Sequence, residues 1–141
     1  MAEDAPPRHA GEYAKAGAVG FGVNFGCLLV PPVHPLGALV GPFVGGFIAG
    51  SRFRATGSQA TLIGLIMGSA FGVLLGIPSL VVLFSPLASA VGVASGTRTV
   101  IAIGIVFVIC YVGLVGAIGA AVGGNHAARS AADPPPPGSG A

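Results

Sequence analysis

The sequence predicts an all-α polytopic membrane protein, with four transmembrane helices packed through glycine zippers. Of its 141 residues, 53% are hydrophobic and 7% are charged, and the mean hydropathy is +0.91. The charged residues leave uncharged stretches of 36, 43 and 30 residues, between Lys15, Arg52, Arg54, Arg98 and Arg129. A soluble domain carries about a quarter of its residues as charges. This composition therefore excludes an ordinary soluble enzyme, a nucleic-acid binder and a disordered chain.

The first two spans are expected at residues 14–30 and 36–53, after a flexible N-terminal tail at residues 1–13. The first ends at Pro31-Pro32, because proline cannot continue a helix without loss of a hydrogen bond. The second is short and carries Pro42 in its first two turns. Because both arms are short and PPVHP leaves a tight turn, this pair could instead be a re-entrant hairpin that does not fully cross.

The third and fourth spans are expected at residues 59–84 and 99–123, close to the length of about 20 residues that a bilayer requires. The segment between them, 85–98, is rich in small residues and suits an outer loop or a short interfacial helix. The transmembrane bundle therefore covers residues 14–124. A flexible Pro- and Gly-rich C-terminal tail is expected at residues 125–141.

The basic residues predict the orientation, because Lys and Arg concentrate on cytoplasmic loops. Arg98 is alone on one side. The other side carries five basic residues: Arg8, Lys15, Arg52, Arg54 and Arg129. We therefore expect a multi-pass protein of the cell (inner or plasma) membrane, with both termini in the cytoplasm. Lys15, Arg52 and Arg54 are expected to act as interfacial anchors by reaching towards anionic headgroups.

Small residues recur at every fourth position and give each span a face on which backbones can approach closely. The predicted helix-packing residues are Gly22, Gly26, Gly37, Gly41, Gly45, Gly64, Gly68, Gly72, Gly76, Gly116 and Gly124. These faces could pack the monomer alone, or at least one could form a homo-oligomer. A repeat is also suggested, since residues 22–32 and 68–78 share six identities in eleven positions.

The run LGALVGPFVGGFIAG, followed by a polar loop and ATLIGLIMGSAFGVLL, resembles a family of small Gly-rich four-helix prokaryotic membrane proteins of unknown function. That family is best populated among haloarchaea. The resemblance covers about residues 35–76 and depends mainly on glycine spacing. It implies a helical membrane fold but no activity and no functional residues.

Polar chemistry within the expected spans is sparse. Asn24 is the one strongly polar side chain expected near mid-bilayer, where it suits either a hydrogen bond between helices or a pore contact. None of the acidic residues lies within a span, and Cys27 and Cys110 lack the spacing of a metal or redox motif. We therefore predict no catalytic residue, no cofactor and no metal ligand.

The sequence favours a non-enzymatic structural or accessory membrane module that acts through helix packing. The alternative is a small oligomeric channel or transporter for ions or small solutes. Expected partners are the lipid bilayer and either a second copy or another membrane protein, and not nucleic acid.

Overall fold

A computed structural model describes residues 10–29 and 34–132 of the chain. These residues form α1 (Ala10–Leu29), α2 (His34–Phe53), α3 (Gly57–Phe71), the π-helical segment η2 (Gly72–Gly76), α4 (Ile77–Phe84), α5 (Pro86–Ala90) and α6 (Ser95–Ala132). Within these ranges there is no strand, so the predicted all-α class is confirmed.

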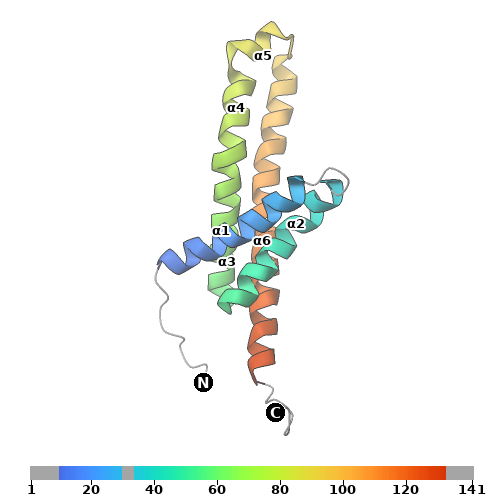
Figure 1. Cartoon of the computed structure of the whole chain (residues 1–141). Helices are drawn as coiled ribbons and strands as arrows, with labels where there is room; N and C mark the ends of the chain where they lie inside the picture. Colours follow the sequence, from blue (N-terminus) through green and yellow to red (C-terminus); the bar gives the residue numbers. More distant parts are fainter. Residues whose placement is uncertain (1–9, 30–33, 133–141) are drawn as a thin grey trace.

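The helices form two hairpins of unequal length (Figure 1). The long hairpin consists of α3, η2 and α4 running one way and α6 running back, with α5 across the connection. The shorter hairpin, α1 and α2, crosses the long hairpin obliquely and covers only part of its length. The most extensive helix–helix contact joins α2 to α6, which are far apart in the sequence.

Three stretches of the described chain are long and apolar enough to cross a bilayer. They are Pro35–Phe53, Gly57–Phe84 and Ser95–Ala132, with 19, 28 and 38 residues. Helix α1 does not meet this measure within the part of the chain that the structure describes. Its first turns carry Glu12 and Lys15, and its glycines add little hydropathy. The apolar helices support insertion in a membrane.

Several helix ends differ from the sequence expectation. Helix α1 begins at Ala10, inside the expected N-terminal tail, and the rest of that tail lies outside the described residues. Helix α6 continues to Ala132, so the prediction of a flexible tail from residue 125 is wrong for residues 125–132. That stretch, NHAARSAA, is rich in alanine, the residue with the highest helix propensity. The first proline that follows is Pro134.

Two prolines lie within the helical path and change it locally. Pro42 lies inside α2, where it cannot donate the regular hydrogen bond to the Ala38 carbonyl. Pro78 lies in the first turn of α4, directly after the wider π-helical turn η2. There the backbone N–H of Ile77 donates to the Gly72 carbonyl, five residues earlier. Such a turn lets the helix pass a proline without ending.

A tight turn joins α2 to α3. The backbone N–H of Ala55 donates to the Gly50 carbonyl (3.0 Å), and that of Arg54 donates to the Ser51 carbonyl (3.4 Å). These two bonds form a Schellman cap, and Arg54 has the positive φ of 47° that the cap requires. The Gln59 side chain then accepts a hydrogen bond from the backbone N–H of Thr56 at the start of α3 (3.2 Å).

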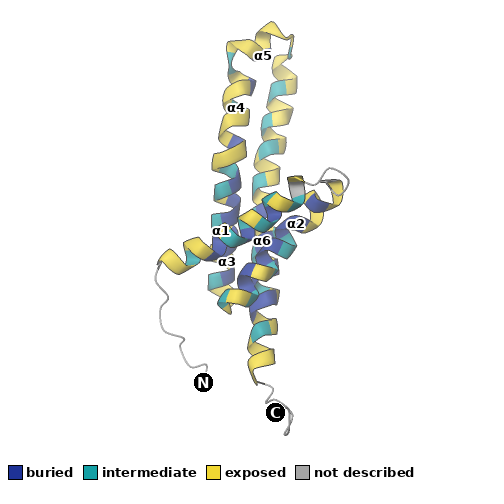
Figure 2. Ribbon diagram, viewed as in Figure 1, coloured by how far each residue is buried: buried dark blue, intermediate teal, exposed yellow. Residues whose placement is uncertain are grey.

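Buried residues gather where the two hairpins cross, whereas the end of the long hairpin near α5 is largely exposed (Figure 2). The buried cluster combines small and large apolar side chains: Ala16, Ala49, Ala55, Ala60, Ile63, Met67 and Ala120. The exposed end presents large apolar side chains on both helices of the hairpin, including Val81, Phe84, Val100 and Ile103. An apolar exterior of this kind suits lipid rather than water.

Candidate functional site

The contact between α2 and α6 depends on glycine at positions where no larger residue fits. A Cβ atom on Gly46 would overlap the Gly116 carbonyl, and one on Gly50 would overlap the Ala120 backbone. From the other side, Cβ atoms on Gly119 and Gly123 would meet the backbone of α2. Backbones this close give the van der Waals contact that holds helices together in lipid.

In the long hairpin, the predicted packing residues of α3 and η2 lie against α6, and those of α6 lie against the core and the turn between α2 and α3. Gly64 lies against the backbone of Gly113, and a Cβ on Gly68 would be 3.1 Å from the Gly113 Cα. Gly72 and Gly76 face the Ile109 side chain. On α6, Gly124 lies against the backbone of Ala55, and Gly116 lies near Met67.

The predicted residues of the short hairpin fall into two groups. Gly37, Gly41 and Gly45 of α2 face α1, where a Cβ on each would meet Cys27, Asn24 and Gly20 respectively. Gly22 and Gly26 of α1 are exposed, and a Cβ on either would have no described atom within 4 Å. Within one copy of the described chain these two residues therefore do not pack against another helix.

Asn24 is buried between α1 and α2, with 1% of its surface exposed. Neither its Oδ1 nor its Nδ2 atom has a hydrogen-bond partner within the described part of the chain. The Oδ1 atom lies on the α2 side, 2.5 Å from where a Cβ on Gly41 would stand. An unpartnered amide in an apolar interior costs about 1–3 kcal/mol, so this side chain requires an explanation.

A crevice of about 530 Å³ opens beside Asn24. Five elements contribute to it: Asn24 and Phe25 of α1, Ala38 and Leu39 of α2, Phe71 of α3, Leu75 of η2, and Phe107, Val108, Tyr111 and Val112 of α6. Apart from the Asn24 amide and the Tyr111 hydroxyl, these side chains are apolar. The volume lies within the range of about 300–1,000 Å³ that is typical of small-molecule sites.

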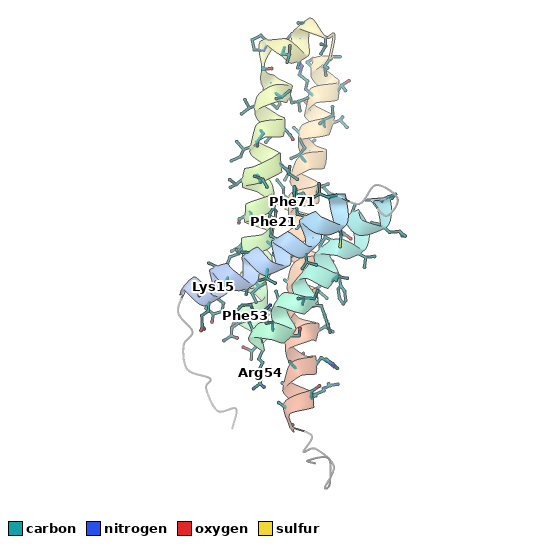
Figure 3. All side chains as sticks on the ribbon, viewed as in Figure 1. Lys15, Phe21, Phe53, Arg54 and Phe71 are labelled. Atoms are coloured by element: carbon teal, nitrogen blue, oxygen red, sulfur yellow. The ribbon has the colours of Figure 1, made fainter. Side chains whose placement is uncertain are left out.

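Aromatic rings hold the wall of this crevice. Phe21 stacks on Phe25 with 5.7 Å between ring centroids. It also meets Phe71 edge to face at 6.0 Å, so it joins α1 to α3 (Figure 3). On the opposite wall, the Tyr111 hydroxyl donates a hydrogen bond of 2.6 Å to the Leu39 carbonyl, which ties α6 to α2.

The predicted interfacial anchors Lys15, Arg52 and Arg54 are all exposed. Arg54 lies at the turn between α2 and α3, at the opposite end of the long hairpin from α5 (Figure 3). Arg98 lies at the α5 end, where its Nη2 donates to Ser89 Oγ (2.8 Å) and its Nε donates to the Val93 carbonyl (3.0 Å).

The set of packing residues predicted from the sequence omits several residues that form these contacts. Gly20, Gly119 and Gly123 pack as closely as the predicted glycines, and Met67 is fully buried beside Gly20 and Gly116. The sequence signal for these contacts is the small-xxx-small spacing of Gly46 with Gly50 and of Gly119 with Gly123. The pairing of Tyr111 with Leu39 has no sequence signal, because it depends on how the two hairpins cross.

The described residues contain no group of three or more His, Cys, Asp or Glu side chains that could hold a metal ion. Comparisons with protein families, with curated proteins and with solved structures find no match to this chain. The resemblance of residues 35–76 to small Gly-rich four-helix membrane proteins therefore stays an expectation.

Proposed function

We propose that this chain is a non-enzymatic accessory protein of the cell membrane, with both termini cytoplasmic, which acts by presenting helix surfaces to other helices in the bilayer. The observation that carries the proposal is the division of its glycines. The glycines between α2 and α6 already make close backbone contacts within the protein. A Cβ on Gly22 or Gly26 of α1, by contrast, would have no described atom within 4 Å. With the exposed Ala18, they form an unused small-xxx-small face.

The same geometry supports a re-entrant short hairpin rather than four full spans. Helices α2 and α6 run in the same direction where they cross, and Leu39 lies opposite Tyr111. At about 1.5 Å per residue, Tyr111 is about 20 Å along α6 from Arg98. Even if α2 ran along the axis of α6, the first residue of α2 would still lie about 12 Å short of Arg98, measured along that axis.

These distances support the placement of the bilayer that we propose. Arg98 and Asn125 of α6 are about 40 Å apart along the helix axis, close to the thickness of a bilayer with its headgroup regions. Tyr111 lies half-way between them, at the midplane. Helix α2 is long and apolar enough to be a span, yet its outer end stops near this level. Pro35, the second residue of α2, carries no backbone N–H, so it adds no unpaired donor at this outer end of the helix.

Oligomeric state in lipid nanodiscs tests the proposed function. We expect the wild type to form a homo-oligomer or a complex with another membrane protein. Gly22→Leu with Gly26→Leu should abolish that assembly and leave the helix content unchanged. Gly104→Leu is the matched control, because Gly104 is also exposed, with no described atom within 4 Å of a Cβ. Assembly that survives the double substitution would contradict the role of this face.

Solute flux separates the proposal from the channel alternative. We expect liposomes containing the protein to release ions and small polar solutes no faster than empty liposomes, because the crevice beside Asn24 is lined almost entirely by apolar side chains. Robust flux that Asn24→Leu abolishes and Asn125→Leu retains would favour the channel or transporter.

A further inference from the structure

The crevice beside Asn24 has the features of a binding site for a particular class of molecule. It combines a volume of about 530 Å³ with one buried amide that lacks a partner. Leu39 and Phe107 on its walls are 62% and 71% exposed, so the crevice opens on the outside of the bundle. In the proposed membrane placement this opening faces the lipid phase.

The polar groups of the crevice define what an occupant must offer. The Asn24 amide provides two N–H donors and one acceptor oxygen. The Ala38 carbonyl lacks its regular helical donor, because Pro42 has no N–H. Asn24 and Ala38 both line the crevice, so its wall contains both donor and acceptor groups, and a hydroxyl group is the smallest uncharged group that matches both.

Charge excludes other classes of occupant. None of the described residues that line the crevice is an Asp, Glu, His, Lys or Arg, and the Tyr111 hydroxyl donates its hydrogen bond to the Leu39 carbonyl. A charged headgroup would be desolvated there without a counter-ion, which is strongly unfavourable. Water alone is a poor occupant because it needs two to four polar partners, and most of this volume is bounded by aliphatic and aromatic side chains.

We propose that this crevice binds an uncharged, membrane-soluble alcohol with a long apolar chain, and that the Asn24 amide holds its hydroxyl group. The chain of the molecule lies against the apolar wall that includes Leu39, Leu75 and Phe107. This assignment rests on the proposed membrane placement, and it explains why a costly amide is kept at mid-bilayer.

Photolabelling of the full chain in phosphatidylcholine nanodiscs tests the assignment. The probe is hexadecanol with a diazirine in its chain, and the competitors are unlabelled hexadecanol and hexadecane. We expect label on peptides that contain Leu39 or Phe107. We expect hexadecanol to compete about tenfold better than hexadecane, the effect of one good hydrogen bond. Equal competition by the two would overturn the proposal, as would label spread evenly over the lipid-facing helices.

Two matched pairs of variants sharpen the test. Asn24→Leu should remove the preference for the alcohol, whereas Asn125→Leu, an exposed site on α6 outside the crevice, should retain it. If Asn24→Leu does not fold, Ala38→Phe serves instead, because it fills the crevice from α2 and should abolish labelling. Its control is Ala128→Phe, at an exposed position of α6 outside the crevice. A preference that survives in a folded Asn24→Leu or Ala38→Phe protein would overturn the proposal.

The outcome can be separated from that of the proposed function. Cysteine accessibility reports the membrane placement, and nanodisc stoichiometry reports the assembly. If both behave as proposed while hexadecane competes as well as hexadecanol, only the binding assignment is wrong.

Discussion

Gly46 of α2 lies so close to Gly116 of α6 that a Cβ atom on Gly46 would overlap the Gly116 carbonyl oxygen. The atoms that would clash belong to backbone on both sides, so no side chain can move to relieve the overlap. Contact at this distance is open only to residues without a side chain. The α2–α6 interface is therefore sensitive to the addition of a single methyl group.

Gly46→Ala should destabilise the protein by about 1–3 kcal/mol, the range for overpacking. Gly22→Ala, on the open face of α1, should be neutral or stabilising by up to about 1 kcal/mol, because alanine is the better helix former. Unfolding free energy in mixed detergent micelles measures both. A destabilisation of equal size at the two positions would contradict the α2–α6 packing described above.

Tyr111→Phe should weaken the attachment of the short hairpin to the long one, because it removes the hydrogen bond to the Leu39 carbonyl. Hydrogen bonds between membrane helices average about 0.6 kcal/mol and reach about 1.7 kcal/mol. The same micelle assay should give a loss of that size. Tyr13→Phe is the control, and the bond would be judged unimportant if both variants had the same stability.

Gly92→Ala should destabilise the turn between α5 and α6 by about 1–2 kcal/mol, because Gly92 has a φ of 79° that other residues adopt only with strain. Gly96→Ala lies four residues on, in the first turn of α6, with open space around it. It should be neutral or slightly stabilising. Thermal unfolding in detergent distinguishes them, and similar melting temperatures for the two variants would argue against a strained Gly92.

Single cysteines in a background of Cys27→Ala and Cys110→Ala can measure the depth of the short hairpin. Thr97→Cys should react with a membrane-impermeant maleimide from the outside, and Arg52→Cys should react only from the inside. Leu36→Cys, at an exposed position near the outer end of α2, should react from neither side because it lies near the midplane. Labelling of Leu36→Cys from outside as fast as Thr97→Cys would indicate four full spans.

Hydropathy and proline positions predict much of the helical arrangement. The expected span 36–53 corresponds to α2 at His34–Phe53, and the expected span 59–84 corresponds to Gly57–Phe84, including the passage at Pro78. Ends without a proline or a charge to define them are less predictable. Helix α6 illustrates this, because it extends past the apolar stretch at both of its ends.

Glycine spacing predicts which face of a helix is small but not what that face meets. Gly64 and Gly22 satisfy the same four-residue rule, yet one lies against Gly113 and the other faces open space. The sequence likewise does not predict the depth of the short hairpin, because a count of apolar residues does not say where along α6 a helix lies. The crevice beside Asn24 results from the way the two hairpins cross, and no local sequence pattern predicts it.

The contact of α2 with α6 also affects the order in which the helices can pack while the protein is being synthesised. Helix α2 leaves the ribosome before α3, yet most of the surface on which it rests belongs to α6, which ends at Ala132. Gly46 and Gly50, the glycines of α2 that face α6, have no partner until α6 has been synthesised. The short hairpin must therefore wait in or near the membrane during translation and pack in its final place only after α6 has been synthesised. Chains truncated before residue 113 should retain their apolar helices but leave α2 open to capture by chaperones or proteases.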